Sequence, residues 1–187
     1  MIAFIASVSA GEIVAILTAI SNLNPVAGRF QYTRTEKNVV AIIDYAHTPD
    51  ALKNVLKTIQ EVRTGNEKVI TVIGCGGDRD KTKRPLMAGV ACEFADKVIL
   101  TSDNPRTENA DLIIEDMKTG VEGQHFKKTL AITDRKEAIR TAVTLAEPGD
   151  ILLVAGKGHE KYQEINGERL PFDDFEIVTN TLQLFEK

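Results

Sequence analysis

The chain of 187 residues has no tryptophan, only two cysteines, and aromatic side chains at 5% of its positions. Two cysteines cannot form a disulfide framework, which excludes the small disulfide-stapled folds and fits a reducing compartment. An excess of basic charge is also missing, since 23 Lys and Arg stand against 27 Asp and Glu, for a net charge of −4. The composition therefore gives no indication of a nucleic-acid partner.

Long apolar runs are absent as well, and none approaches the roughly 18 residues that a membrane span needs. The apolar start, Met1 to Val8, is too short for a signal peptide and has no basic flank, because the first basic residue is Arg29. We therefore expect a cytoplasmic protein with no membrane partner. What remains is ordinary globular composition, 43% hydrophobic and 27% charged, which is enough for one domain with a sizeable core.

The first 27 residues predict one helix and a linker. Ser9 to Glu12 form a capping box, and apolar residues continue at helical spacing to Ile20, so we expect a helix over about residues 10–22. Asn24-Pro25 ends this helix. One helix is too little to be a domain, so residues 1–27 need a neighbour to pack against.

From about residue 30 onward, strand patterns alternate with helix patterns. Apolar runs typical of buried strands lie at residues 39–43, 69–73, 98–100, 129–132 and 151–155. Helices are expected from Thr48-Pro49 onward, over about 84–95, over 110–118 with Gly120 as the closing cap, from Asp134 to about Ala146, and over about 173–185. Asn166-Gly167 predicts a type I′ hairpin between two further short strands. The alternation predicts an α/β fold, a Rossmann-like, doubly wound and mostly parallel sheet of five to six strands with a terminal hairpin.

Ligands of such folds bind beyond the carboxyl ends of the strands, and four strand-end loops of this chain are rich in polar residues. The first runs from Asp44 to Asp50. An acid at a strand end can bond a ribose hydroxyl, and the helix N-terminus that follows favours anions. Thr48, Pro49 and Asp50 are better explained as the start of a helix, whereas a functional role for Asp44 and His47 stays open.

The second loop, Gly74 to Arg84, is rich in glycine and charge. Its spacing is Gly-x-Gly-Gly-x-Arg, which does not match the dinucleotide fingerprint, and no phosphate-binding Walker pattern occurs in the chain. Four basic and two acidic residues lie between Asp78 and Arg84. This mixture indicates a site for a zwitterion or a phosphate, although a solvated loop is the alternative. Cys75 is interpreted as a small filler rather than a nucleophile.

The third and fourth loops are Asp103-Asn104-Pro105-Arg106 and Gly156 to Glu160. Arginine suits bidentate recognition of a carboxylate, while Asp, Asn or Glu can accept from an ammonium. An exposed turn, with Thr107 or Asn109 capping the next helix, is the alternative for the third loop, and His159 is interpreted as structural. Together with Arg79 of the second loop, these side chains match the two charges of an amino acid.

These loops also carry a family resemblance. The matching segments are Gly28-Arg29-Phe30, Asp44 to Asp50, Gly74 to Met87, Asp103 to Arg106, Gly156 to Glu160 and Pro171 to Asp174. In this order, over about residues 28–187, they resemble the Mur ligase family, in particular the C-terminal domain of its MurE type. That enzyme type adds diaminopimelate to UDP-N-acetylmuramoyl-L-alanyl-D-glutamate in peptidoglycan synthesis. Asp103 to Arg106 is similar to the signature for meso-diaminopimelate as opposed to lysine.

The resemblance implies an ATP-dependent reaction. ATP phosphorylates the D-glutamyl carboxylate of the UDP-linked dipeptide, and the amine of diaminopimelate displaces phosphate from the acyl phosphate. By this resemblance the residues that bind diaminopimelate are Arg79, Asp103, Asn104, Arg106, Gly156 and Glu160. An arginine would take the distal carboxylate and Glu160 the distal ammonium. The nucleotide would be bordered by Arg29, Asp44 and His47. No catalytic residue or metal ligand is assigned to this chain.

The resemblance also implies partners that this sequence does not contain. ATP and magnesium are held mainly by the family's central domain, and the UDP group by its N-terminal domain. Residues 1–27 resemble the last helix and linker of that central domain, so we expect no ligase activity from residues 1–187 alone. Phe175 stands where a basic residue is expected.

Three other functions are compatible with parts of this pattern. The first is a non-catalytic module that binds diaminopimelate or a nucleotide. The second, a nucleotide-dependent oxidoreductase, is disfavoured by the glycine spacing of the second loop. The third is a related amide ligase, such as a folylpolyglutamate or cyanophycin synthetase, and the match at Asp103 to Arg106 argues against it.

Overall fold

The computed structural model describes residues 28–185, so the helix predicted over residues 10–22 and the role predicted for residues 1–27 lie outside the described residues. In chain order the elements are β1 (Gln31–Arg34), β2 (Val40–Asp44), α2 (Pro49–Val62), β3 (Val69–Cys75), α3 (Lys83–Phe94), β4 (Lys97–Ser102), α4 (Ala110–Lys118), the 3-10 helix η1 (Gly123–Lys128), β5 (Thr129–Ala131), α5 (Arg135–Leu145), β6 (Ile151–Ala155), β7 (Tyr162–Ile165), β8 (Glu168–Pro171) and α6 (Asp174–Leu184).

Six strands form the central sheet in the order β1-β2-β6-β3-β4-β5, and β7 pairs with β8 in a separate hairpin. Strands β2 to β6 pair in parallel, whereas β1 lies antiparallel at the edge. The prediction of a mostly parallel α/β sheet with a terminal hairpin is confirmed. Strand β1 was not predicted, because Gln-Tyr-Thr-Arg is short, polar and only half-buried.

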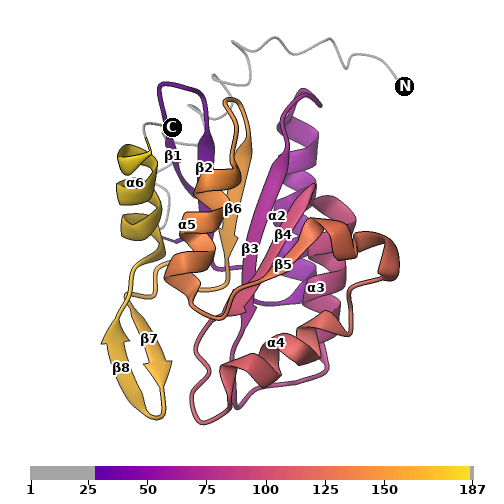
Figure 1. Ribbon diagram of the computed structural model, residues 1–187, viewed down its shortest axis with the longest axis vertical. Coiled ribbons are helices and arrows are strands. Elements are labelled where there is room, and N and C mark those ends of the chain that lie inside the picture. Colours follow the sequence, from indigo (N-terminus) through magenta and orange to yellow (C-terminus); the bar gives the residue numbers. More distant parts are fainter. Residues whose placement is uncertain (1–27, 186–187) are drawn as a thin grey trace, which may run out of the picture.

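Helices cover both faces of this sheet (Figure 1), with α2, α3 and α4 on one side and α5 and α6 on the other. One apolar cluster joins the sheet to Leu56 of α2, Met87 of α3 and Ile113 of α4. A second joins the opposite face to Ile139 of α5 and Val178 of α6. Since both faces are covered, the central strands β3 and β6 are buried along their whole length, as their continuous apolar sequences require.

Local sequence signals set the ends of these elements. Thr48 caps α2 by accepting from the Ala51 N–H, and Asp134 caps α5 by accepting from the Glu137 N–H. Asn166 and Gly167 have φ of 50° and 82°, as a type I′ turn requires. Among residues 28–185, no helix combines the length and apolar character needed to cross a membrane.

Helix α4 ends at Lys118, as predicted, but Gly120 does not close it in the way that a glycine cap usually does. The capping residue is Thr119, which is right-handed helical at φ −62°, and Gly120 is not among the positive-φ glycines. A Cβ atom at Gly120 would instead lie 1.9 Å from the Pro85 carbonyl oxygen. The glycine is required because the end of α4 approaches the first turn of α3 too closely for any side chain.

Candidate functional site

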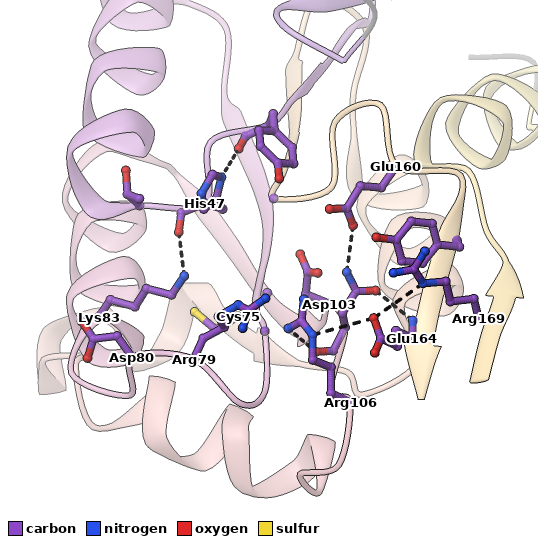
Figure 2. Close-up of a pocket in the computed structure, with 17 residues that line it drawn as sticks. His47, Cys75, Arg79, Asp80, Lys83, Asp103, Arg106, Glu160, Glu164 and Arg169 are labelled. Atoms are coloured by element: carbon purple, nitrogen blue, oxygen red, sulfur yellow. Dashed lines mark hydrogen bonds and ion pairs between the residues drawn. The ribbon is translucent and has the colours of Figure 1, made fainter. Parts of the chain in front are cut away.

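The strand-end loops surround a cleft of about 720 Å³ at the carboxyl edge of the sheet. Figure 2 shows His47, Lys83 and Asp80 on one side and Glu160, Glu164 and Arg169 on the other, with Asp103 and Arg106 between them. All six residues expected to hold an amino acid line this cleft, namely Arg79, Asp103, Asn104, Arg106, Gly156 and Glu160. Of the three expected near a nucleotide, His47 lines it, whereas Arg29 and Asp44 are not among the lining residues.

Glycines let the loops after β3, β4 and β6 touch one another. Gly156 has φ of 117°, and a Cβ atom there would lie 2.6 Å from Asp103 Oδ2. A Cβ atom on Gly77 would lie 1.9 Å from the Pro105 carbonyl oxygen, and the Gly77 N–H donates to the Asn104 carbonyl oxygen at 2.9 Å. The three loops therefore form one surface rather than three independent segments.

The hairpin holds Arg106 in the wall of the cleft. Arg106 has φ of 53°; its N–H donates to the Glu164 carbonyl oxygen at 3.0 Å, and its own carbonyl accepts from the Asn166 N–H at 2.7 Å. Its guanidinium donates to the Gly77 carbonyl oxygen at 2.8 Å and lies 3.8 Å from the Glu164 carboxylate. Backbone hydrogen bonds to the hairpin thus fix the position of the Arg106 backbone. Glu164 and Arg169 of the hairpin also line the cleft.

A buried network lies between the third and fourth loops. The Asn104 amide donates to Glu160 Oε2 at 2.8 Å, and its oxygen accepts from Lys157 Nζ at 2.8 Å and from the Glu164 N–H at 2.9 Å. Lys157 Nζ also lies 3.3 Å from Glu160 Oε2 and 3.8 Å from Asp103 Oδ1. The sequence reasoning missed Lys157. Its position directly after a fully apolar strand, between two glycines, is the signal that could have found it.

The charge-rich second loop divides into a structural part and a cleft-facing part. Arg84 is buried and bonds Glu108 and Asp116, each at 2.8 Å. The bond from Arg84, reinforced by the Asp78 N–H, lowers the pKa of Glu108 to about 2. Arg84 therefore connects α3 to the segment that follows the third loop. Arg79 and Lys83, which belong to the second loop like Arg84, line the cleft instead.

Asp44 is committed to the backbone around it. Its carboxylate accepts from the Phe30 and Ala46 N–H groups, each at 2.8 Å. Burial raises the pKa of Asp44 above its ordinary value, although these two bonds and the charge of Arg29 oppose the shift. Thr48, Pro49 and Asp50 begin α2, as expected.

His47 lies at the mouth of the cleft, next to Tyr45. Its Nδ1 lies 2.8 Å from the Tyr45 carbonyl oxygen, and its own carbonyl accepts from Lys83 Nζ at 3.0 Å. The Tyr45 ring lies between the rings of His47 and His159, with centroid distances of 4.6 and 5.1 Å. Burial, followed by the negative charges of Glu160 and Asp103, raises the pKa of the Tyr45 phenol, which is therefore neutral near pH 7.

Cys75 lines the cleft but is unsuited to nucleophilic chemistry. Burial raises the pKa of its thiol to about 12, so the reactive thiolate is scarce at neutral pH. Within residues 28–185, moreover, no group of three or more His, Cys, Asp or Glu residues is placed to hold a metal ion. The described residues therefore do not fit magnesium on their own.

A fully buried ion pair lies behind the cleft. Arg135 bonds Asp174 at 2.9 and 2.7 Å, and neither side chain has any exposed surface. Arg135 also donates to the carbonyl oxygens of Ser102 at 3.4 Å and Ala155 at 3.1 Å, the last residues of β4 and β6. The pair thus ties together the strand ends that carry the third and fourth loops. Phe175, where a basic residue was expected, packs against the second apolar cluster.

The cleft can hold a small ligand that bears charges of both signs. Arg79, Lys83 and Arg106 offer cationic groups, whereas Asp103, Glu160 and Glu164 offer carboxylates. The fold and the cleft together define an α/β domain with a charged cleft at the carboxyl edge of its sheet, the edge at which ligands of such folds bind. Residues 28–158 match the Mur ligase glutamate ligase domain, and the chain belongs to that family.

Named relatives agree with this assignment. The chain is 60% identical over 163 residues to UDP-N-acetylmuramoyl-L-alanyl-D-glutamate--2,6-diaminopimelate ligase of Bacteroides thetaiotaomicron, covering 87% of this chain and 34% of the relative. It is 53% identical over 172 residues to the ligase of the same name from Cytophaga hutchinsonii, covering 92% of this chain and 35% of the relative. The chain thus spans about a third of the length of these curated relatives.

Solved structures show the same architecture. A solved structure of UDP-N-acetylmuramoyl-L-alanyl-D-glutamate--2,6-diaminopimelate ligase matches this chain with a TM-score of 0.79 at 43% identity. The match covers 94% of this chain and 37% of that chain. UDP-N-acetylmuramate-alanine ligase of Thermotoga maritima matches with a TM-score of 0.54 at 17% identity, covering 94% of this chain and 37% of that chain. The second likeness extends only to the fold.

Proposed function

We propose that this chain is the amino-acid-binding domain of an ATP-dependent ligase, one that adds meso-diaminopimelate to UDP-N-acetylmuramoyl-L-alanyl-D-glutamate in peptidoglycan biosynthesis. The observation that carries the proposal is the gathering of Arg79, Asp103, Asn104, Arg106, Gly156 and Glu160 in one cleft. The names of the relatives at 53% and 60% identity support the choice of amino acid. Such an enzyme would work in the cytoplasm, where its nucleotide-linked substrate and ATP are found.

The charges of the cleft suit the distal end of diaminopimelate, which carries a carboxylate and an ammonium. Arg106 and Arg79, whose side chains both lie beside Gly76, would bind the carboxylate, because a guanidinium matches its geometry. Glu160 and Asp103 would accept from the ammonium. Asn104 would form a further hydrogen bond with the ligand. Gly156 has no side chain, so the backbone at this position would come close to the ligand. Lysine has the ammonium but lacks the distal carboxylate, so it would lose the arginine contacts.

In the proposed reaction the chain's own residues orient the amine. ATP would phosphorylate the D-glutamyl carboxylate, and the proximal amine of diaminopimelate would attack the acyl carbon. A C–N bond forms, the C–O bond to phosphate breaks, and the amine loses a proton. Gripping the distal end leaves the proximal amine free to reach out of the cleft. Arg29, Asp44 and His47 would border the nucleotide on its ribose and phosphate side.

Calorimetry on the 187-residue chain tests the binding proposal. We expect meso-diaminopimelate to bind and L-lysine to bind at least about ten-fold more weakly, since a charge-assisted bidentate contact is lost. Arg106→Met should remove most of this preference. Arg140→Met, which changes an exposed arginine of α5, is the matched control and should leave it unchanged. Equal affinity for the two amino acids, or no binding of diaminopimelate, would refute the proposal.

A non-catalytic module that binds diaminopimelate is the second candidate, because binding an amino acid needs only the cations and carboxylates that line the cleft. Turnover separates the two. We expect residues 1–187 alone to form no product from ATP, the UDP-linked dipeptide and diaminopimelate. Joining the chain to the remaining two thirds of a relative such as that of Bacteroides thetaiotaomicron should give an active ligase if the first proposal is right. An inactive but folded hybrid that still binds diaminopimelate would favour the second.

A further inference from the structure

Lys157 is a charged side chain beneath the floor of the cleft. It has no exposed surface, and it is not among the residues that line the cleft. Its neighbours Gly156 and Gly158 both have positive φ, so the backbone at this point turns the lysine inward. Burying an ammonium is unfavourable unless each of its donors finds a partner, and a methionine would fill the same space without that cost. The charge therefore needs an explanation.

The ammonium of Lys157 bonds the side-chain amide of Asn104. Its oxygen accepts from Lys157 Nζ at 2.8 Å and from the Glu164 N–H at 2.9 Å, so its NH₂ group must face Glu160. In the flipped orientation the amide NH₂ would face two donors and the oxygen would face a carboxylate. Lys157 thus makes one orientation of Asn104 strongly preferred, although amide orientations are otherwise easily exchanged.

The ammonium of Lys157 also contacts the carboxylate of Glu160. Its Oε2 atom accepts from Asn104 at 2.8 Å and lies 3.3 Å from Lys157 Nζ, so both contacts fall on the same oxygen and restrict the plane of the carboxylate. Asp103, whose Oδ1 lies 3.8 Å from the same ammonium, is the other acid of the cleft floor. Two carboxylates and one buried ammonium leave a single negative charge, which matches one ligand ammonium.

We propose that Lys157 is a positioning residue for amino-acid recognition: from beneath the cleft it orients the Asn104 amide and the Glu160 carboxylate toward the ligand's ammonium. It does not touch the ligand itself. The inference rests on the proposed function for the identity of the ligand. The orientation of Asn104, however, is a property of the unliganded chain and can be measured without any ligand.

Calorimetry with meso-diaminopimelate compares wild type, Lys157→Met and Lys161→Met. The methionine at 157 fills the same volume but removes the charge and the donors. We expect Lys157→Met to weaken binding by about ten-fold or more, because the Asn104 amide and the Glu160 carboxylate lose the charge-assisted hydrogen bonds that orient them. Lys161→Met is the matched control: its ammonium is exposed, pairs with Asp173 and lies outside the cleft lining, so binding should change less than about two-fold.

A double-mutant cycle separates positioning from a general structural effect. Because Lys157 acts through both Asn104 and Glu160, Lys157→Met should weaken binding by a smaller factor in the Asn104→Ala background than in wild type. Fully additive losses, or unchanged binding in Lys157→Met, would overturn the inference. Circular dichroism checks that each variant is folded, and Lys157→Gln replaces the methionine variant in the cycle if that one does not fold.

An NMR measurement on the free chain keeps the inference separate from the proposed function. The side-chain NH₂ resonances of Asn104 should be sharp and slow to exchange in wild type, and should broaden or exchange rapidly in Lys157→Met. Unchanged Asn104 signals in that variant would refute the positioning role, whatever the ligand. If wild type shows the expected signals but does not bind diaminopimelate, the proposed function fails while the orientation of Asn104 by Lys157 stands.

Discussion

Replacing Asp174 with alanine should destabilise the domain more than almost any other single change of a polar residue. Its carboxylate forms two hydrogen bonds with Arg135, at 2.9 and 2.7 Å, and neither side chain is exposed. Burial by itself would lower the pKa of Arg135, but the charge and hydrogen bonds of Asp174 raise it above its ordinary value. Without Asp174, the guanidinium would remain buried and charged, with only two backbone carbonyl oxygens as partners.

The expected loss follows from this geometry. Removing one partner of a buried ion pair costs about 3–5 kcal/mol, since the remaining charge is left uncompensated. A domain is stable by about 5–15 kcal/mol in total, so Asp174→Ala should remove a large share of the stability. The effect should reach the cleft as well, because Arg135 bonds the carbonyl oxygens of Ser102 and Ala155, immediately before Asp103 and Gly156.

Urea unfolding followed by circular dichroism measures the free-energy change. Arg140→Ala is the matched control, since Arg140 lies on α5 with Arg135 and forms a 2.7 Å pair with Glu137, but the side chains of Arg140 and Glu137 are about half exposed. An exposed pair of this kind is worth about 0.5 kcal/mol or less. A loss below about 1 kcal/mol for Asp174→Ala would refute the reasoning. Arg135→Met combined with Asp174→Leu should lose less than Asp174→Ala, because no charge is left behind.

Other predictions concern the burial of Cys75, the ion pair of Glu108 with Arg84, and the close approach at Gly120. Because its pKa is about 12, the Cys75 thiol should react with a thiol reagent at pH 8 far more slowly in the folded chain than in urea; equal rates would contradict the burial. The pKa of Glu108 is lowered from 4.5 to about 2, so its contribution to stability is full above pH 4.5 and is lost as the pH falls toward 2. Between pH 4.5 and 2, the free energy of unfolding measured by urea titration should therefore depend less on pH in Glu108→Gln than in wild type. Gly120→Ala should lower the melting temperature, since its Cβ would lie 1.9 Å from a backbone oxygen and overpacking costs about 1–3 kcal/mol, whereas Gly123→Ala, with nothing within 4 Å, should not.

Most of the fold could be predicted because its elements carry local signals. Strands β3 and β6 are buried on both faces, which makes them continuous apolar runs, and such runs are visible without knowing their neighbours. Strand β1 could not be predicted in this way. It is held at the edge of the sheet by its pairing with β2, and its own sequence has neither a long apolar run nor a clear alternation.

The position of the cleft could be predicted from the topology of the sheet. The identity of the residues that line it could be predicted only in part. Parallel strands bring their carboxyl ends to one edge, so charged loops far apart in the sequence were expected to meet there. Which of those charges face a ligand depends on tertiary partners that the sequence does not display. Arg84 and Arg79 belong to the same charged stretch, yet Arg84 is buried against two carboxylates while Arg79 lines the cleft.

Buried cations support the loops from which the acids and bases of the cleft extend. Arg84, Arg135 and Lys157 lie behind the loops that follow β3, β4 and β6, and each is bonded to the chain's own oxygens. Their contacts are short and their side chains have almost no exposed surface, so these loops have little freedom to close over an empty site. The charges in the lining are thereby held at separations set by the scaffold. A ligand with matching charges would then bind a site that is already ordered, and would lose less free energy to the ordering of side chains.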